Sequence, residues 1–301
     1  MKSDALWLRA HIIKTIRNFF WDQGFLEVET PLLIPANAPE EHINPVTALP
    51  WQLQTSPEIC MKRLLRRGHQ RLFQISHCWR ADERGSRHLQ EFTMLEWYRA
   101  ECDYQTLMSD CEGLLQHVAA VCLSNNPVYH HKSRIIDPFR SWRHIAVQEA
   151  FLQFGHADVW DCLQKGQYEE VLTGLIEPKL TEFSEPVILM DYPSELAALA
   201  CLKPGQVKLA ERFELYLGGL ELANGFSELN DPDEQRRRFE EANRLRLKNG
   251  STPLPLPEPF LRELAGMPAS AGIALGVDRL VMLATGADSI DEVVAFTPEE
   301  L

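Results

Sequence analysis

The sequence predicts an α+β fold, in which one antiparallel sheet is flanked by helices. Two stretches alternate with a period of two on either side of a turn, at residues 71–99 and 213–225, as antiparallel hairpins do. Because no repeat or long linker interrupts the chain, we expect a single domain over residues 1–301. A helical spacing of apolar residues opens the chain, at Leu8, Ile12, Ile16 and Phe19.

The composition excludes several classes of protein. The 301 residues are 45% hydrophobic, enough for a sizeable core. A net charge of −13 makes most of the surface repel polyanions, so we expect no general DNA binding and no stable tRNA binding. Charges interrupt the apolar positions of the first helix, which argues against a signal peptide or a membrane span.

The cysteines indicate a reducing compartment. None belongs to a CxxC pair, and their spacing fits neither a zinc knuckle nor a small disulfide scaffold. We therefore expect a cytoplasmic protein with free thiols, at Cys60, Cys78, Cys102, Cys111, Cys122, Cys162 and Cys201.

The first half of the chain is readable element by element. The opening helix follows Ser3 and Asp4 as candidate caps and stops at Gly24. A short strand in "FLEVETP" ends at Pro31, because proline cannot donate to a ladder. The next expected elements are a helix in "SPEICMKRLLRRG", a hairpin whose loop spans residues 82–90, and a helix in "DYQTLMSDCEGLLQHVAAVCL".

The second half is less regular at first. Residues 124–185 are mixed, with helices expected around "WRHIAVQEAFLQF" and "EEVLTGLIEPKL". "FELYLGGLELANG" predicts a hairpin that turns at Gly218 and Gly219. A charged helix in "PDEQRRRFEEANRLRLKNG", an extended "STPLPLPEPF" and an apolar helix from Val277 follow.

The first hairpin carries a cluster of chemically useful side chains. Period-two geometry sends Phe92, Glu96 and Tyr98 to one face of the second strand. Taken singly, these residues fit an ordinary core and a solvated loop. Together with cations they offer a phosphate site, a ring for a purine and an anionic site for an amine. The cations are Arg80, Arg84, Arg87 and His88.

Acidic residues on the second hairpin suggest a cation site. The Gly-Gly turn pairs Tyr216 with Glu221, which leaves Glu214 diagonal to Glu221 on the same face. Two such carboxylates, completed by phosphate oxygens, suit Mg²⁺; the alternative that both point to water stays open. Asn224 and Glu228 would converge on one side if their segment is helical.

The stretch "GIALGVDRLVML" contains two glycines and an arginine at an unfavourable helical position. Gly272 and Gly276 permit close backbone approach before the helix begins. Arg279 lies in the first helical turn, where the macrodipole disfavours a cation, so either a ligand or an ion pair with Asp278 or another acid must compensate. The sequence contains no Walker A motif, GxGxxG, nucleophile elbow or HExxH.

Several of these stretches resemble a known family. "FLEVETP", "RADERGSRHLQEFTMLEWY" and "GIALGVDRL" resemble, in order, motifs 1, 2 and 3 of class II aminoacyl-tRNA synthetases, in the lysyl branch. "TSPEICMKRLL" and "ELYLGGLELANGFSELND" resemble the same branch. The chain begins at the motif 1 helix, so we expect no anticodon-binding domain. With "TSPE" and Ala274 it is most similar to the stand-alone branch whose members ligate (R)-β-lysine to elongation factor P.

The resemblance implies an enzyme that uses ATP and Mg²⁺ to form an aminoacyl-adenylate and passes the acyl group to a lysine of elongation factor P. It also implies a homodimer through motif 1. Arg80 and Arg279 would be catalytic residues. Arg80 would bind the α-phosphate and the reacting carboxylate, and Arg279 would bind the distal phosphate. Glu214 and Glu221 would hold magnesium.

The resemblance carries the other site roles to matching positions. Phe92 would stack on adenine. The implied ATP-binding set is Arg80, Ala81, Asp82, His88, Leu89, Phe92, Glu221, Leu222, Gly276 and Arg279. The implied pocket for a lysine-like amino acid is Ser56, Pro57, Glu58, Glu96, Tyr98, Asn224 and Glu228.

Two departures keep other functions open. The family usually has Glu at Asp82, and His-Asn-Pro where this chain has His88, Leu89 and Gln90. Leu89 cannot hydrogen-bond to a nucleotide. The alternatives are a synthetase paralogue that activates α-lysine or charges tRNA, and a non-catalytic regulator that binds ATP or lysine.

Overall fold

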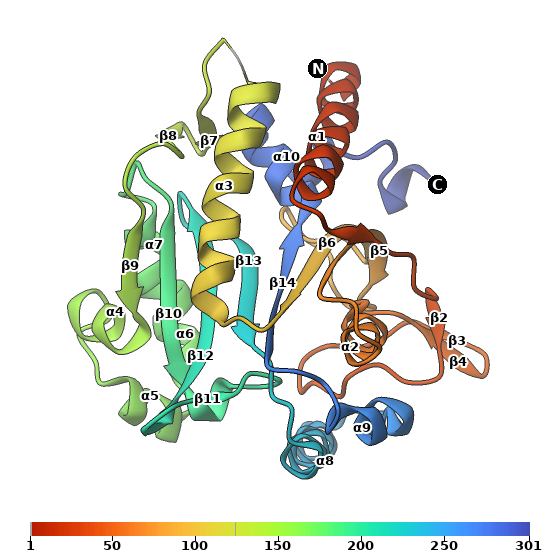
Figure 1. Ribbon diagram of the computed structural model, residues 1–301. Helices are drawn as coiled ribbons and strands as arrows, with labels where there is room; N and C mark the ends of the chain where they lie inside the picture. The colour runs from red at the N-terminus through yellow and green to blue at the C-terminus, as the bar shows by residue number, and fades with distance from the viewer. Residues whose placement is uncertain (1, 124) are drawn as a thin grey trace.

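The computed structural model describes residues 2–123 and 125–301, and Figure 1 shows their arrangement. The helices are α1 Lys2–Asp22, α2 Glu58–Arg66, α3 Tyr104–Cys122, α4 Val147–Gln153, α5 Val159–Lys165, α6 Tyr168–Val171, η1 Leu172–Ile176, α7 Glu177–Leu180, η2 Ser194–Leu196, α8 Pro232–Lys248, α9 Glu258–Leu264, α10 Val277–Thr285, η3 Ile290–Glu292 and η4 Pro298–Glu300. The strands are β1 Leu26–Glu27, β2 Leu33–Ile34, β3 Thr47–Ala48, β4 Trp51–Leu53, β5 Arg71–Trp79, β6 Glu91–Ala100, β7 Tyr129–His131, β8 Arg134–Ile136, β9 Arg143–Ala146, β10 Val187–Pro193, β11 Leu202–Lys203, β12 Gln206–Leu217, β13 Leu220–Ser227 and β14 Ser270–Gly276.

One large sheet organises the molecule and confirms the α+β prediction. Its strands run in the order β1-β5-β6-β14-β13-β12-β10-β9, with β11 added beside β12. The inner pairs are antiparallel, as expected, whereas β1 joins β5 and β9 joins β10 in parallel. The sheet is therefore mixed at its two ends.

The alternation along β6 divides the sheet into a packed face and an open face. Leu95 and Trp97 are fully buried in the largest core cluster, which also takes in side chains of α1, α3 and α10. In Figure 1, α3 crosses this face of the sheet with α1 and α10 nearby. The intervening side chains of β6 point the other way, as the period-two pattern predicts.

Two smaller helical groups close the ends of the sheet. Helices α4 to α7 pack with β9 and β10 around Phe151 and Ile176. Helices α2, α8 and α9 pack around Phe239 and Phe260 below the other half, as the lower part of Figure 1 shows.

Two local expectations were wrong in detail. The strand expected in "FLEVETP" keeps only two residues, because the amide of Thr30 donates to the side chain of Gln74 instead of continuing the ladder. The first residues of "RHIAVQEAF" form β9 because they pair with β10, and the helix starts at Val147. Asn224 lies on strand β13, as the predicted hairpin requires, so the helical segment on which its convergence with Glu228 depended is not formed.

The Gly218–Gly219 turn is confirmed. Both glycines have positive φ, at 57° and 76°, which two-residue hairpins require. Tyr216 pairs with Glu221 as predicted, but a bulge beyond it pairs Glu214 with Asn224.

Within the described ranges, no helix has both the length and the apolar character to cross a membrane. The seven cysteines are all free thiols.

Candidate functional site

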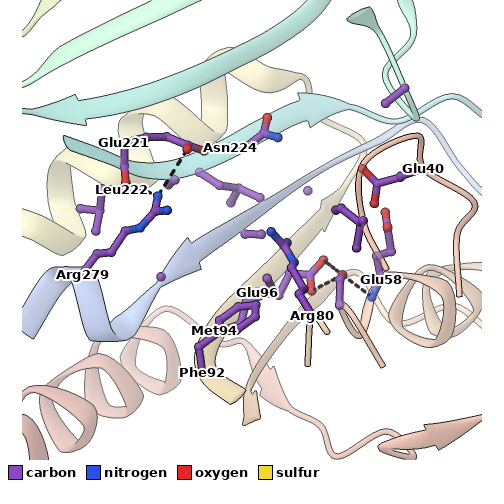
Figure 2. Close-up of a pocket in the computed structure, with 18 of the residues that line it drawn as sticks. Glu40, Glu58, Arg80, Phe92, Met94, Glu96, Glu221, Leu222, Asn224 and Arg279 are labelled. Atoms are coloured by element: carbon purple, nitrogen blue, oxygen red, sulfur yellow. Dashed lines mark hydrogen bonds and ion pairs between the residues drawn. The ribbon is translucent and has the colours of Figure 1, made fainter. Parts of the chain in front are cut away.

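A cavity of about 290 Å³ lies on the open face of the sheet. Its floor consists of side chains from β6, β13 and β14, including Phe92, Met94, Glu96 and Tyr98 at alternating positions of β6. The walls come from the loop after β5, the start of α2, the loop after β2 and the start of α10. Figure 2 shows Arg279 and Glu221 at one end and Glu40 and Glu58 at the other, with Arg80 and Glu96 between.

The first end is cationic. Arg279 donates to the Glu221 carbonyl at 2.7 Å, and its guanidinium lies 3.3 Å from the Glu221 carboxylate. A third contact, at 2.6 Å, joins Arg279 to the His88 ring. Burial and then the charge of Arg279 lower the pKa of His88, so the ring accepts this hydrogen bond as a neutral group. Asp278, the other acid considered, instead pairs with Arg9 at 2.5 Å.

Arg80 offers unused donors to the middle of the cavity. Its guanidinium lies 5.2 Å from the centre of the Phe92 ring and 3.4 Å from the Glu83 carboxylate. Within residues 2–123 and 125–301, the Arg80 Nε atom is buried without a hydrogen-bond partner. A buried unpaired donor is costly, so this position suits an anionic ligand. A nucleotide base that stacks on the Phe92 ring would lie next to the Arg80 guanidinium, which already covers part of that ring.

The second end is acidic. Glu96 is 3% exposed and accepts from the Tyr98 hydroxyl at 2.6 Å and from the Ser56 hydroxyl at 3.0 Å. Burial, and then the charge of Glu58, raise the pKa of Glu96 to about 8. An ammonium ligand would remove this penalty, because a buried carboxylate is stable when it is paired.

A lysine already neutralises part of this end. Lys62 Nζ lies 2.9 Å from Glu58 Oε2 and 2.7 Å from Glu228 Oε2. Burial alone would lower the pKa of Lys62, but the carboxylates of Glu228 and Glu58 raise it above its ordinary value. Burial raises the pKa of Glu228 to about 7 despite this partner.

Glu214 and Glu221, the two acids expected to hold magnesium, lie in different surroundings. Glu221 lines the cavity, whereas the buried Glu214 accepts from Arg212 at 2.6 Å and from the Tyr216 hydroxyl at 2.7 Å. Burial and the charge of Glu221 raise the pKa of Glu214. A cation bound near both carboxylates would reduce the repulsion between them. The described residues contain no group of three His, Cys, Asp or Glu side chains that could hold a metal. A divalent ion would therefore need oxygens from a bound phosphate.

The structure brings together most of the residues singled out from the sequence. Those that line the cavity are Ser56, Glu58, Arg80, Arg87, His88, Leu89, Phe92, Glu96, Tyr98, Glu221, Leu222, Asn224, Gly276 and Arg279. Those outside its lining are Pro57, Ala81, Asp82, Arg84, Glu214 and Glu228. Gly272 also lines it, and a Cβ there would meet Tyr98 at 2.1 Å and Glu228 at 2.6 Å, which confirms the expected close approach.

Four charged residues of the site were missed, of which Glu83 lies beside Arg80 in the loop after β5. Lys62 lies four residues after Glu58 on α2, a spacing that could have signalled the pair. Arg212 lies two residues before Glu214 on β12 and so shares its face. Glu40 lies in a loop without any periodic pattern, and no signal in the sequence marks it.

The chain is similar to known proteins over nearly its whole length. The family model for class II tRNA synthetases (D, K and N) matches residues 1–300. The elongation factor P (R)-β-lysine ligase of Sodalis glossinidius is 39% identical over an alignment of 314 residues that covers 97% of this chain and 94% of that protein. The ligases of the same name from Haemophilus ducreyi, with 39% identity over 98% and 94% of the two chains, and Pectobacterium atrosepticum, with 38% over 97% and 94%, are similarly close.

Proposed function

Because this chain belongs to the class II tRNA synthetases of the D, K and N group, we propose that it activates (R)-β-lysine with ATP and transfers it to a lysine side chain of elongation factor P. The names of relatives that align over nearly the whole chain support this reaction. The observation that carries the proposal is one cavity in which an unpaired donor of Arg80 and buried carboxylates face the same space.

The first step joins the amino acid to AMP. A carboxylate oxygen attacks the α-phosphorus of ATP, a new P–O bond forms, and the bond to pyrophosphate breaks. Arg80 would bind the reacting carboxylate and α-phosphate, and Arg279 the distal phosphate, so that both cations face charge that develops during attack. Glu221, with Glu214 behind it, would hold a Mg²⁺ ion that neutralises the departing pyrophosphate.

The second step moves the acyl group to the protein acceptor. The unprotonated amine of the acceptor lysine attacks the acyl carbon, and the bond to AMP breaks. The attacking nitrogen then loses a proton. The enzyme's main contribution is to hold the two reactants close together.

The amine-binding end supports a diamino acid as substrate. Glu58, Glu96 and Glu228 lie within one buried cluster that holds a single lysine, Lys62. A substrate with two ammonium groups supplies the missing positive charge, because unpaired buried carboxylates are costly.

Asp82 does not argue against catalysis. It lies outside the cavity lining and accepts from the Asn44 side chain at 2.6 Å. A shorter acid at this position therefore leaves the wall unchanged. Leu89 contributes apolar contact and is 4% exposed.

The same family membership supports a cytoplasmic homodimer. Large apolar side chains are exposed on α1 and the short strands that follow it, and a second copy would cover them. They include Trp7, Trp21, Leu26, Leu33 and Trp51. Sedimentation at micromolar concentration should give a dimer, and a monomer alone would contradict this part of the proposal.

Pyrophosphate exchange tests the activation step. The protein, ATP and Mg²⁺ should exchange labelled pyrophosphate with (R)-β-lysine present, and much more weakly with α-lysine or with neutral amino acids. Preference for α-lysine would favour the alternative synthetase paralogue. Nucleotide binding without any exchange would favour the non-catalytic regulator.

A further inference from the structure

The loop of residues 82–90, between β5 and β6, forms part of the wall at the Arg279 end of the cavity. Arg279 contacts two lining residues of this loop. It donates to the Arg87 carbonyl at 3.4 Å and contacts the His88 ring at 2.6 Å. Because Arg279 is the residue proposed to bind the distal phosphate, the position of the loop decides the shape of the space in which that phosphate would lie.

Arg84 joins this loop to a distant part of the chain. Its Nε atom donates to Glu299 Oε1 and its Nη2 atom to Glu299 Oε2, each at 2.9 Å. The Nη2 atom also lies 3.0 Å from Asp291 Oδ2. Two parallel donors on one carboxylate give an arginine pair a defined geometry. These contacts of Arg84 with Glu299 and Asp291 are called the tether below.

The segment of residues 288–300, which receives Arg84, is itself held by the core. Ile290 and Val293 are 2% and 0% exposed and belong to the largest core cluster. The amide of Ile290 also donates to the Ser86 carbonyl of the loop at 2.8 Å. A segment fixed by the core therefore contacts the loop at two places, a main-chain carbonyl and a guanidinium.

The tether lies where it can act on the loop without deciding global stability. The side chains of Arg84, Asp291 and Glu299 are 33%, 35% and 60% exposed. Ion pairs of this exposure contribute little to the free energy of unfolding. A surface loop, however, opens at a much lower free energy than the core. A modest contact can therefore change how often the loop is in place while the unfolding temperature hardly changes.

We propose that Arg84 is a positioning residue that holds the 82–90 loop against the segment of residues 288–300. Through the tether, the loop keeps its contacts with Arg279, so the nucleotide end of the cavity is formed before ATP arrives. The amine-binding end lies at the opposite side of the cavity and does not depend on the tether. This inference rests on the proposed function and extends it to the residues that keep the nucleotide site in shape.

Pyrophosphate exchange measures the two ends of the cavity separately. Arg84→Gln removes the tether and should raise the KM for ATP roughly 3- to 10-fold, the scale of one or two exposed ion pairs. The KM for β-lysine at saturating ATP should stay near the wild-type value. Glu299→Ala should raise the KM for ATP less, because Asp291 remains. The double variant should match Arg84→Gln alone, since both residues act through one contact.

Arg63→Gln is the matched control. Arg63 makes the same kind of contact through two nitrogens with Glu263, at 3.1 and 2.7 Å, and the two side chains are 28% and 31% exposed. Neither residue lines the cavity. The control variant should lose a similar surface pair and leave the KM for ATP unchanged.

Limited digestion with trypsin reports the position of the loop without any activity. Glu299→Ala keeps the tryptic sites after Arg84 and Arg87. Both sites should be cleaved faster in this variant than in the wild-type protein, and ATP with Mg²⁺ should slow the cleavage. Glu263→Ala, the corresponding control, should be cleaved in this loop at the wild-type rate.

The outcomes separate the tether from the proposed function. If the wild-type protein exchanges pyrophosphate but Arg84→Gln keeps the wild-type KM for ATP, the Arg84 assignment is overturned alone. Loop cleavage in Glu299→Ala at the wild-type rate would overturn it as well. An equal rise of both KM values together with a lower unfolding temperature would show a merely structural role. Absence of exchange in the wild-type protein with every diamino acid would overturn the proposed function and this inference together.

Discussion

Lys62 Nζ lies 2.7 Å from Glu228 Oε2, and each side chain is 1% exposed. The same ammonium lies 2.9 Å from Glu58 Oε2. One internal cation therefore pairs with two carboxylates at the amine-binding end. Among the described residues, neither Glu96 nor Glu40 forms an ion pair with a lysine or arginine.

Lys62→Met should destabilise the protein by about 3–5 kcal/mol, because it leaves buried carboxylates unpaired. A diamino ligand supplies positive charge, so β-lysine should raise the unfolding temperature more in this variant than in the wild-type protein. Thermal unfolding with and without β-lysine checks both effects. Lys179→Met removes an exposed pair with Glu182 and should change little. Equal behaviour of the two variants would contradict the assignment.

The pH dependence follows from the raised carboxyl pKa values. Burial, and then the charge of Glu58, raise the pKa of Glu96 from its ordinary 4.5 to about 8 in the folded protein. The folded state then binds more protons than the unfolded state between these values, so stability should fall as pH rises from about 4.5 to 8. Glu96→Gln should flatten this slope in thermal unfolding. A slope that is the same in wild-type and variant proteins would show that Glu96 does not titrate in this range.

Substrate affinity should change with pH in the opposite direction. An ammonium binds the ionised carboxylates, whose pKa values burial raises to about 7 for Glu40 and about 8 for Glu96. The affinity for β-lysine should therefore rise between pH 6 and 8, with net proton release on binding. Calorimetry in buffers of different ionisation enthalpy measures that release directly. Proton uptake would contradict the proposed pairing.

Arg80→Ala and Arg279→Ala should each lower the rate of pyrophosphate exchange by roughly 10²–10³-fold, as expected when one donor to developing charge is lost. Unfolding temperature should change much less than activity, because the anionic partner of Arg80 is expected to be a ligand. Arg140→Ala removes an exposed arginine that does not line the cavity and serves as the control. Unchanged exchange in either test variant would make the site assignment wrong.

Local patterns predicted the parts of the site that lie on regular elements. Phe92, Glu96 and Tyr98 share one face because β6 alternates, and this alternation was visible in the sequence. The glycines at 218 and 219 fixed the hairpin that presents Glu221. The spacing of four residues between Asn224 and Glu228 was interpreted only for a helix. Because four is an even number, the same spacing also places two residues on one face of a strand, and Asn224 lies on strand β13.

The remaining features depend on contacts between distant segments. Glu40 reaches the cavity because Arg246, more than two hundred residues later, binds its loop. The parallel pairs at the sheet edges arise in the same way, from β1 against β5 and β9 against β10. Arg84, expected at an open cationic mouth, instead pairs with Asp291 at 3.0 Å and Glu299 at 2.9 Å. No local pattern encodes such long-range partners.

Transfer of the acyl group tests the central claim most directly. Labelled (R)-β-lysine, ATP and Mg²⁺ are incubated with the protein and with either purified elongation factor P or total tRNA. The net charge of −13 disfavours a broad contact with a polyanion, so label should appear in an amide on a lysine of elongation factor P and not on tRNA. Label on the 3′ end of tRNA, with none on elongation factor P, would contradict the account.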